Sequence, residues 1–183
     1  MAELDACASP ALIAHSWRTY LWGAAFGALD EIKHDPELLL IGSLLHDLGA
    51  TPKHHGCHDC HCFSVDSAKA AMLWAEVNAV PVDRTRQLGE MITLHMNGHV
   101  TLDDGAEALL LQQGAACDVI GVRYHEIDAR DTTRVLDEHP RQGFNREFIS
   151  FLKKEAELRP HSRAALLMDS GLALLIRANP FDE

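Results

Sequence analysis

The segment from Leu38 to Leu45 is apolar on nearly every side of a helix, and clear signals bound it. Asp35 and Pro36 supply a capping side chain and a first-position proline, so we expect a helix to begin there. Gly49 predicts where that helix stops. Because a helix that is apolar all round is buried, we expect this one to be central to the fold.

The rest of the sequence also predicts helices. Ser9 and Pro10 repeat the start signal and open a helix that runs to about Leu29. No convincing run of alternating apolar and polar residues indicates a strand. Further helices are expected from Ser64, from Pro81 to near Gly98, over Asp104–Ile120, and around Thr132–Glu138, Asn145–Leu158 and Ser162–Ala178. Since neither a repeat nor a long linker divides the chain, we predict an all-α, compact, single-domain helical bundle spanning residues 1–183.

Charge and hydropathy narrow the expected partners. The formal net charge is −11 and Lys and Arg form no cluster, so we expect no nucleic-acid partner. No apolar stretch approaches the length of about 18 residues that a membrane span needs. The first ten residues lack the basic start and apolar block of a signal peptide. We therefore expect a cytoplasmic protein that acts on a small molecule and does not bind membranes, with a homo-oligomer left open.

A polar pair, His46-Asp47, directly follows the apolar segment. Burying an ionisable Asp beside a His costs free energy unless both find a partner. The carboxyl end of a helix carries partial negative charge, which favours a cation. A metal ion is one such partner, and a hydrogen bond between the two side chains is the alternative. His15 and Asp118 also stand as polar residues in small or apolar stretches, and this context favours the metal.

The order of a His, a His-Asp pair and a distant Asp resembles the signature of the HD superfamily of metal-dependent hydrolases. The local sequence is most similar to the cyanamide hydratase-like branch of that superfamily. The joint order of the matching pieces, which span roughly residues 12 to 123, makes the resemblance specific. These pieces are His15–Tyr20, Leu44–Thr51, Phe63–Asp66, Thr93–His95 and Cys117–Gly121, with Phe144–Phe151 adding to them.

The resemblance implies an HD-type helical fold in which His15, His46, Asp47 and Asp118 bind one divalent metal. Two imidazoles and two carboxylates neutralise such an ion and leave positions open for water and substrate. This mixed set accepts zinc, iron or manganese, and the cyanamide branch implies zinc. The implied activity is that of a hydrolase or hydratase whose metal-activated water attacks a small substrate. For a cyanamide-like nitrile the product is a urea-type amide.

Three further residues are candidates for catalysis. Three interpretations of His95 remain open: a core histidine held by a hydrogen bond, a proton shuttle, and a ligand of a second metal. Arg18, three residues after His15, either meets an anionic substrate or pairs with Asp47 or Asp118. Asp66 is the third candidate.

The loop from residue 54 to residue 62 departs from the family pattern. Its cysteines include a pair with metal-ligand spacing, and histidines stand between them, so the loop is a candidate for a second metal site. The residues of this candidate site are Cys57, His58, Cys60, His61 and Cys62. Three interpretations remain open: a structural zinc, a segment that covers the active site and lends a histidine, and a solvated loop with incidental thiols.

Other functions compete with the hydratase. A phosphohydrolase of nucleotides or phosphate esters needs cations, for which Arg18, Lys69 and Arg123 are candidates. A two-iron oxygenase needs further histidines, such as His95 and one from the 54–61 loop. A metal sensor without turnover would hold its ion in that loop. A pocket of only a few atoms would favour cyanamide-like molecules, and a long cationic groove would favour nucleotides.

Overall fold

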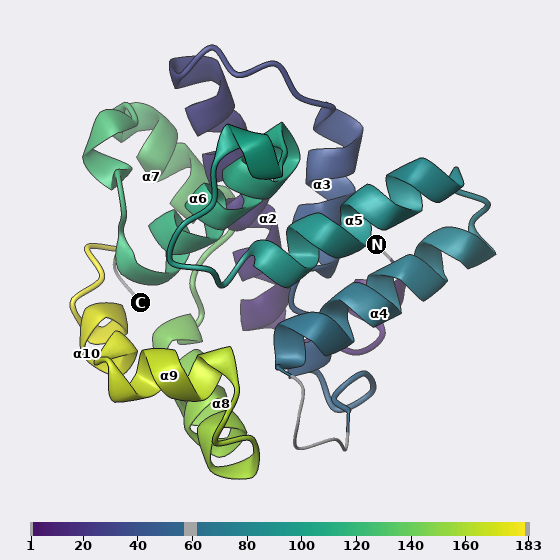
Figure 1. Ribbon diagram of the computed structural model, residues 1–183. Helices are drawn as coiled ribbons and strands as arrows, with labels where there is room; N and C mark the ends of the chain where they lie inside the picture. Colours follow the sequence, from purple (N-terminus) through teal and green to yellow (C-terminus); the bar gives the residue numbers. More distant parts are fainter. Residues whose placement is uncertain (1, 57–61, 182–183) are drawn as a thin grey trace.

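The computed structural model describes residues 2–56 and 62–181, and this part of the chain is helical without any strand. The prediction of an all-α fold is confirmed (Figure 1). The helices are α1 (Ala2–Asp5), α2 (Pro10–Leu29), α3 (Pro36–Leu45), α4 (Phe63–Val77), α5 (Val82–Leu94), α6 (Ala106–Ile120), α7 (Ala129–Glu138), α8 (Phe144–Leu158), α9 (Arg163–Asp169) and α10 (Leu172–Arg177). Short 3₁₀ helices cover Leu48–Ala50, Leu102–Asp104 and Tyr124–Glu126.

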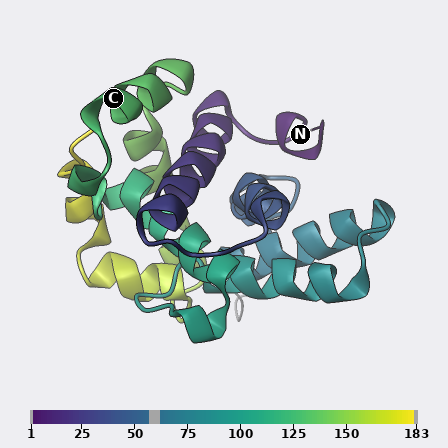
Figure 2. The same cartoon turned by 90° about the horizontal axis from the view of Figure 1, so that it is seen from above.

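The predicted start signals cap α2 and α3. The Ser9 hydroxyl accepts a hydrogen bond from the backbone N–H of Leu12 at 3.1 Å. The Asp35 carboxylate accepts from the N–H groups of Glu37 and Leu38 at the start of α3. Helix α3 buries most of its leucines and, viewed from above, lies between α2 and the α4–α5 pair (Figure 2). It is therefore the central helix that its apolar sequence predicts.

Helices α2 and α6 pack closely because glycines stand at their contact. A Cβ on Gly114 would lie 2.2 Å from the carbonyl oxygen of Thr19, and one on Gly23 would lie 2.7 Å from that of Leu110. Real Cβ atoms essentially never approach an oxygen that closely, so both positions require the absence of a side chain. This close approach brings His15 on α2 and Asp118 on α6 to the same place.

The remaining helices form two groups around this pair. Helices α4 and α5 pack side by side on one flank, and α8, α9 and α10 contact one another on another (Figure 1). The C-terminal group has its own apolar cluster, to which α2 contributes Ala11 and Leu12 and the start of α4 contributes Phe63.

Several boundaries differ from the predicted ones. Helix α5 ends at Leu94 instead of near Gly98. Directly after this end, Nδ1 of His95 donates a hydrogen bond to the carbonyl of Ile92. The predicted helix over 162–178 is two helices, because Gly171 adopts a φ of +95° between them. Gly49 lies inside a 3₁₀ turn, where a Cβ would lie 2.1 Å from a backbone oxygen of α4. Helix α1 was not predicted from the sequence.

Within the described residues, none of the helices combines the length and apolar character that crossing a bilayer requires.

Candidate metal centre

His46 and His95 occupy equivalent positions, each directly after the last residue of a helix. Nδ1 of His46 donates to the carbonyl of Ser43 at 2.7 Å, and Nδ1 of His95 donates to that of Ile92 at 2.6 Å. Because a carbonyl oxygen only accepts, a neutral ring in this position carries its proton on Nδ1 and a lone pair on Nε2. Burial lowers the pKa of His46 to about 3, which keeps that ring neutral.

His15 lies on α2 and is oriented by Asp118 on α6. Its Nδ1 donates to Oδ2 of Asp118 at 2.7 Å, and its ring stacks on Phe144 with centroids 4.3 Å apart. Its Nε2 faces the opposite way and lies 3.2 Å from Nε2 of His46. Burial would lower the pKa of His15, but the hydrogen bond with Asp118 and the nearby carboxylate of Asp47 outweigh burial and raise it. The surroundings of this ring thus favour a positive charge.

Asp47 lies where the three imidazoles converge. Its Oδ2 is 3.5 Å from Nε2 of His15 and 3.4 Å from Nε2 of His46, and its Oδ1 is 3.4 Å from Nε2 of His95. Its side chain is 1% exposed, yet neither oxygen accepts a hydrogen bond from the described part of the chain. Burial would raise the pKa of Asp47, but His46, His15 and His95 hold it well below its usual value. The result is a buried, ionised carboxylate faced by Nε2 atoms.

This donor set fits a divalent metal ion. The ligand atoms of His15, His46 and Asp47 all lie within 4.8 Å of one another. Lone pairs and a carboxylate that face one another inside a protein repel unless a cation or protons lie between them. Two imidazole nitrogens and one carboxylate also form a common ligand set of catalytic zinc sites that keep a position open. The residues present are therefore suited to hold such an ion.

The position of Asp118 differs from the predicted one. Its Oδ1 accepts from Nε of Arg18 at 2.7 Å and from Nε1 of Trp22 at 3.1 Å, and its Oδ2 accepts from Arg18 at 2.8 Å as well as from His15. Burial would raise the pKa of Asp118, but Arg18 and His15 hold it far below its usual range. Since both oxygens are engaged, the structure places Asp118 behind His15 as its orienting carboxylate.

Arg18 takes one of the two predicted roles, the pairing with Asp118. Its side chain is fully buried, and its remaining nitrogen donates to the carbonyls of His139 and Pro140 at 2.9 and 3.2 Å. It is not among the residues that line the cavity beside the histidines. Contact with an anionic substrate, the other role expected from the sequence, stays a prediction.

Asp66 belongs to a different cluster. Its carboxylate pairs with Arg159 at 2.9 Å and accepts from the N–H of Gly56 at 3.0 Å. Arg159 also pairs with the buried Glu155, whose other oxygen binds His55. Asp66 does not line the cavity beside the histidines, and the catalytic role expected from the sequence stays a prediction.

Most of the predicted loop site, Cys57, His58, Cys60 and His61, lies outside the described residues. Cys62 stands at the N-cap of α4. Elsewhere among the described residues, ligand atoms of Glu3, Cys7 and His54 lie within 4.8 Å of one another. Lys53 binds the same Glu3 oxygen as His54, at 2.6 Å, so the charge of that carboxylate is already balanced.

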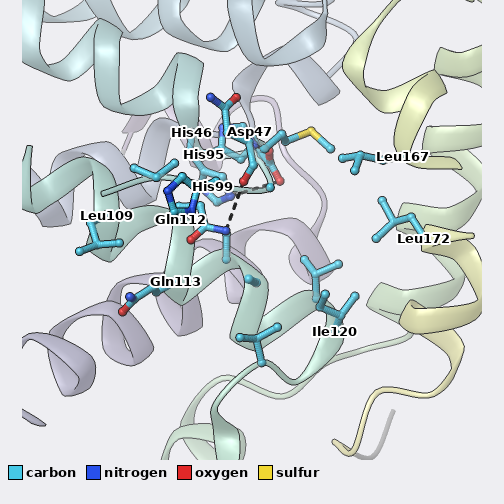
Figure 3. A pocket seen from close by; sticks show the side chains of 18 of the residues that line it. His46, Asp47, His95, His99, Leu109, Gln112, Gln113, Ile120, Leu167 and Leu172 are labelled. Carbon is cyan, nitrogen blue, oxygen red and sulfur yellow. Dashed lines mark hydrogen bonds and ion pairs between the residues drawn. The ribbon is translucent and has the colours of Figure 1, made fainter. Parts of the chain in front are cut away.

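The cavity next to His46 and His95 was not predicted from the sequence (Figure 3). It measures about 420 Å³ and reaches from His15, His46, Asp47 and His95 to the C-terminal helices. The residues that line it come from segments that lie far from one another in the sequence, and no local sequence pattern identifies them. The one local signal was the run Asn97-Gly98-His99, which begins two residues after His95 in a stretch that the sequence assigned to a helix ending near Gly98.

A scan against protein-family models and a search of curated proteins both found no match to this chain.

Proposed function

We propose that this protein is a metal-dependent hydrolase or hydratase of the HD type, similar to the cyanamide hydratase-like branch. The observation that carries the proposal is the convergence of His15, His46 and His95 on the buried carboxylate of Asp47. A helical core gains nothing from burying the Asp47 carboxylate there, because it loses its hydration and accepts no hydrogen bond from the described part of the chain. The order of these residues in the sequence, with the His-Asp pair at its centre, supports the same proposal.

The ion would be held by His15, His46 and Asp47, and zinc is the first expectation for this set. When bound, a divalent ion acidifies water and polarises the group that this water attacks. Asp118 and Arg18 hold the ring of His15 in the orientation that presents Nε2. Backbone carbonyls do the same for His46 and His95.

His95 is the residue best placed to move a proton. Its Nε2 faces Asp47, its Nδ1 is fixed to a carbonyl, and the ring lines the cavity. In nitrile hydration the water oxygen bonds to the nitrile carbon, and its protons are redistributed until an amide forms. Nε2 of His95 accepts a proton from the attacking water and returns it to the substrate nitrogen.

The phosphohydrolase alternative finds little support at this cavity. Arg18 is buried and paired with Asp118. Lys69 lines a different pocket, between α4 and α5. Arg123 lines the cavity, but its guanidinium pairs with Asp30 and Glu126. Among the described residues that line this cavity, a phosphate group would therefore find no Lys or Arg side chain outside an ion pair to add to the metal ion.

The two-iron alternative rests on one observation, the 3.4 Å distance from Nε2 of His95 to Asp47. A carboxylate faced by imidazoles at both oxygens can bridge two ions. Metal counting separates this alternative, since it requires two equivalents of iron per chain.

The experiment combines metal analysis with activity assays. We expect the purified protein to contain about one equivalent of divalent metal and to hydrate nitriles more efficiently than it hydrolyses phosphate esters. His46→Ala and Asp47→Ala are expected to lose both the metal and turnover, whereas His125→Ala, at an exposed position, retains both. Full turnover by metal-free His46→Ala protein would overturn the proposal, and two irons per chain would select the oxygenase.

A further inference from the structure

The cavity beside the candidate metal centre is much larger than a three-atom nitrile requires. Its volume of about 420 Å³ lies in the range of pockets that hold drug-sized ligands. In Figure 3 the labelled residues His46, Asp47, His95 and His99 gather at one end, while Leu167 and Leu172 face them from the C-terminal helices. A triatomic substrate would leave most of this volume to water.

The walls of the cavity are largely apolar. Helix α6 contributes one side, and α8 and the α9–α10 pair contribute another. The apolar side chains include Leu109, Val119, Ile120, Phe148, Leu167 and Leu172. Water gains few hydrogen bonds against such walls, so a ligand that covers them with carbon gains about 25 cal/mol per Å² of apolar surface buried.

Amide side chains provide the polar positions. Asn97, Gln112 and Gln113 line the cavity. The Gln112 side chain donates to the backbone carbonyl of Asn97 at 3.3 Å, and that of Gln113 accepts from Arg123 at 3.0 Å. The side-chain oxygen of Asn97 is buried and accepts no hydrogen bond from the described part of the chain.

The charged side chains that line the cavity disfavour a ligand with a negative charge away from its reacting end. Arg123 is the one Lys or Arg side chain among the described residues that line the cavity. Its guanidinium binds Asp30 at 2.8 Å and Glu126 at 2.6 Å and lies over the ring of Phe26. A carboxylate or phosphate that lay between the apolar walls, away from the metal ion, would lose its hydration without gaining a free Lys or Arg side chain among the described residues.

We infer that this site acts on an uncharged molecule with an apolar body several carbon atoms long. The reacting end reaches His95 and Asp47, and the apolar body lies between α6 and the C-terminal helices. This inference rests on the proposed function. It assigns to the site larger neutral substrates of the same class in place of the smallest nitriles.

The test uses alkyl hydroxamates, whose head group chelates divalent metals, with chains from acetohydroxamate to octanohydroxamate. Binding to the zinc-loaded protein is measured by calorimetry. We expect affinity to rise about fourfold for each added methylene until the cavity is filled. A chain of the same length that ends in a carboxylate is expected to bind more weakly than one that ends in a methyl group.

Variants on α6 locate the alkyl chain. Ala116 lines the cavity, and Ala116→Phe fills part of it, so we expect a flattened dependence on chain length with acetohydroxamate binding retained. Ala106→Phe adds the same ring at the start of α6, outside the cavity, and is expected to leave the dependence unchanged. Circular dichroism of both variants verifies the fold.

The outcomes separate the inference from the proposed function. Hydroxamate binding that is lost in Asp47→Asn reports the metal centre, and its slope against chain length reports the cavity. Equal affinities along the series, or a slope that Ala116→Phe leaves intact in a folded protein, overturn the inference alone. Failure of every hydroxamate to bind in a metal-dependent manner overturns the proposed function.

Discussion

Asp118 accepts a hydrogen bond from Nδ1 of His15 at 2.7 Å across the contact between α6 and α2, and the ring thereby presents Nε2 to Asp47. The same carboxylate forms a two-pronged ion pair with Arg18, one helical turn from His15. The orientation of the histidine is thus fixed by a carboxylate that is itself fixed by a buried arginine.

Replacing Arg18 with Met tests the buried pair. The variant leaves the ionised Asp118 buried with fewer donors, so we expect a loss of about 3–5 kcal/mol in the free energy of unfolding. Urea titration measures this loss. Arg134→Met removes a mostly exposed pair with Asp131 and is expected to change stability by no more than about 0.5 kcal/mol. Equal effects of the two variants would contradict the role given to Arg18.

Replacing Asp118 with Asn tests the orienting hydrogen bond. The amide keeps the size of the side chain and one accepting oxygen, which cannot serve both Arg18 and His15 as the carboxylate does. We expect zinc affinity to fall about 10- to 100-fold, as happens when the outer partner of a ligating histidine is lost. Competition with a chelator measures this affinity. A variant that binds no zinc would instead identify Asp118 as a direct ligand, as the sequence predicts.

Replacing Gly114 with Ala tests the close contact between α2 and α6. The added Cβ would lie 2.2 Å from the carbonyl oxygen of Thr19, so the helices must separate. We expect a loss of about 3 kcal/mol or more in the free energy of unfolding and weaker zinc binding. Gly98→Ala is the matched control, because its Cβ would meet no atom within 4 Å. A destabilisation no larger than that of the control would show that the contact is not tight.

The ion pairs of Arg123 predict a dependence of stability on pH. Hydrogen bonds from Arg123 lower the pKa values of Asp30 and Glu126 in the folded protein. The stabilisation that these two ion pairs give the folded protein is therefore present at neutral pH. It is lost as the pH falls through the lowered pKa values of Asp30 and Glu126. We expect Arg123→Gln to have a lower Tm than the parent protein near pH 7, with a difference that shrinks below about pH 4 and in high salt. A difference that grows on acidification would contradict this account.

The fold followed from local signals where these were strong. Ser9, Asp35 and the prolines after them marked two helix starts, because capping depends on a few neighbouring residues. The break at Gly171 was missed because apolar spacing continues across it and only the backbone conformation reveals the turn. The local sequence was therefore sufficient for the central helix and for the ends of α2, α6, α7 and α8, but not for the end of α5 or for the break between α9 and α10.

The site could be predicted in part. His46-Asp47 stood out because ionisable residues after an apolar helix need a partner, and the resemblance added His15 and Asp118. Which carboxylate Arg18 would reach depended on the packing of α2 against α6, which no local pattern encodes. The cavity depended on contacts between α6 and the C-terminal helices. The ion pair of Asp66 with Arg159 could not be foreseen, because the two residues are remote in sequence.

The central claim is that His15, His46 and Asp47 surround one divalent ion. Anomalous diffraction from crystals grown with zinc, recorded on both sides of the zinc absorption edge, tests it most directly. The account predicts one strong peak bounded by Nε2 of His15, Nε2 of His46 and the carboxylate of Asp47. Zinc bound elsewhere on the chain, with no peak among these three side chains, would contradict it.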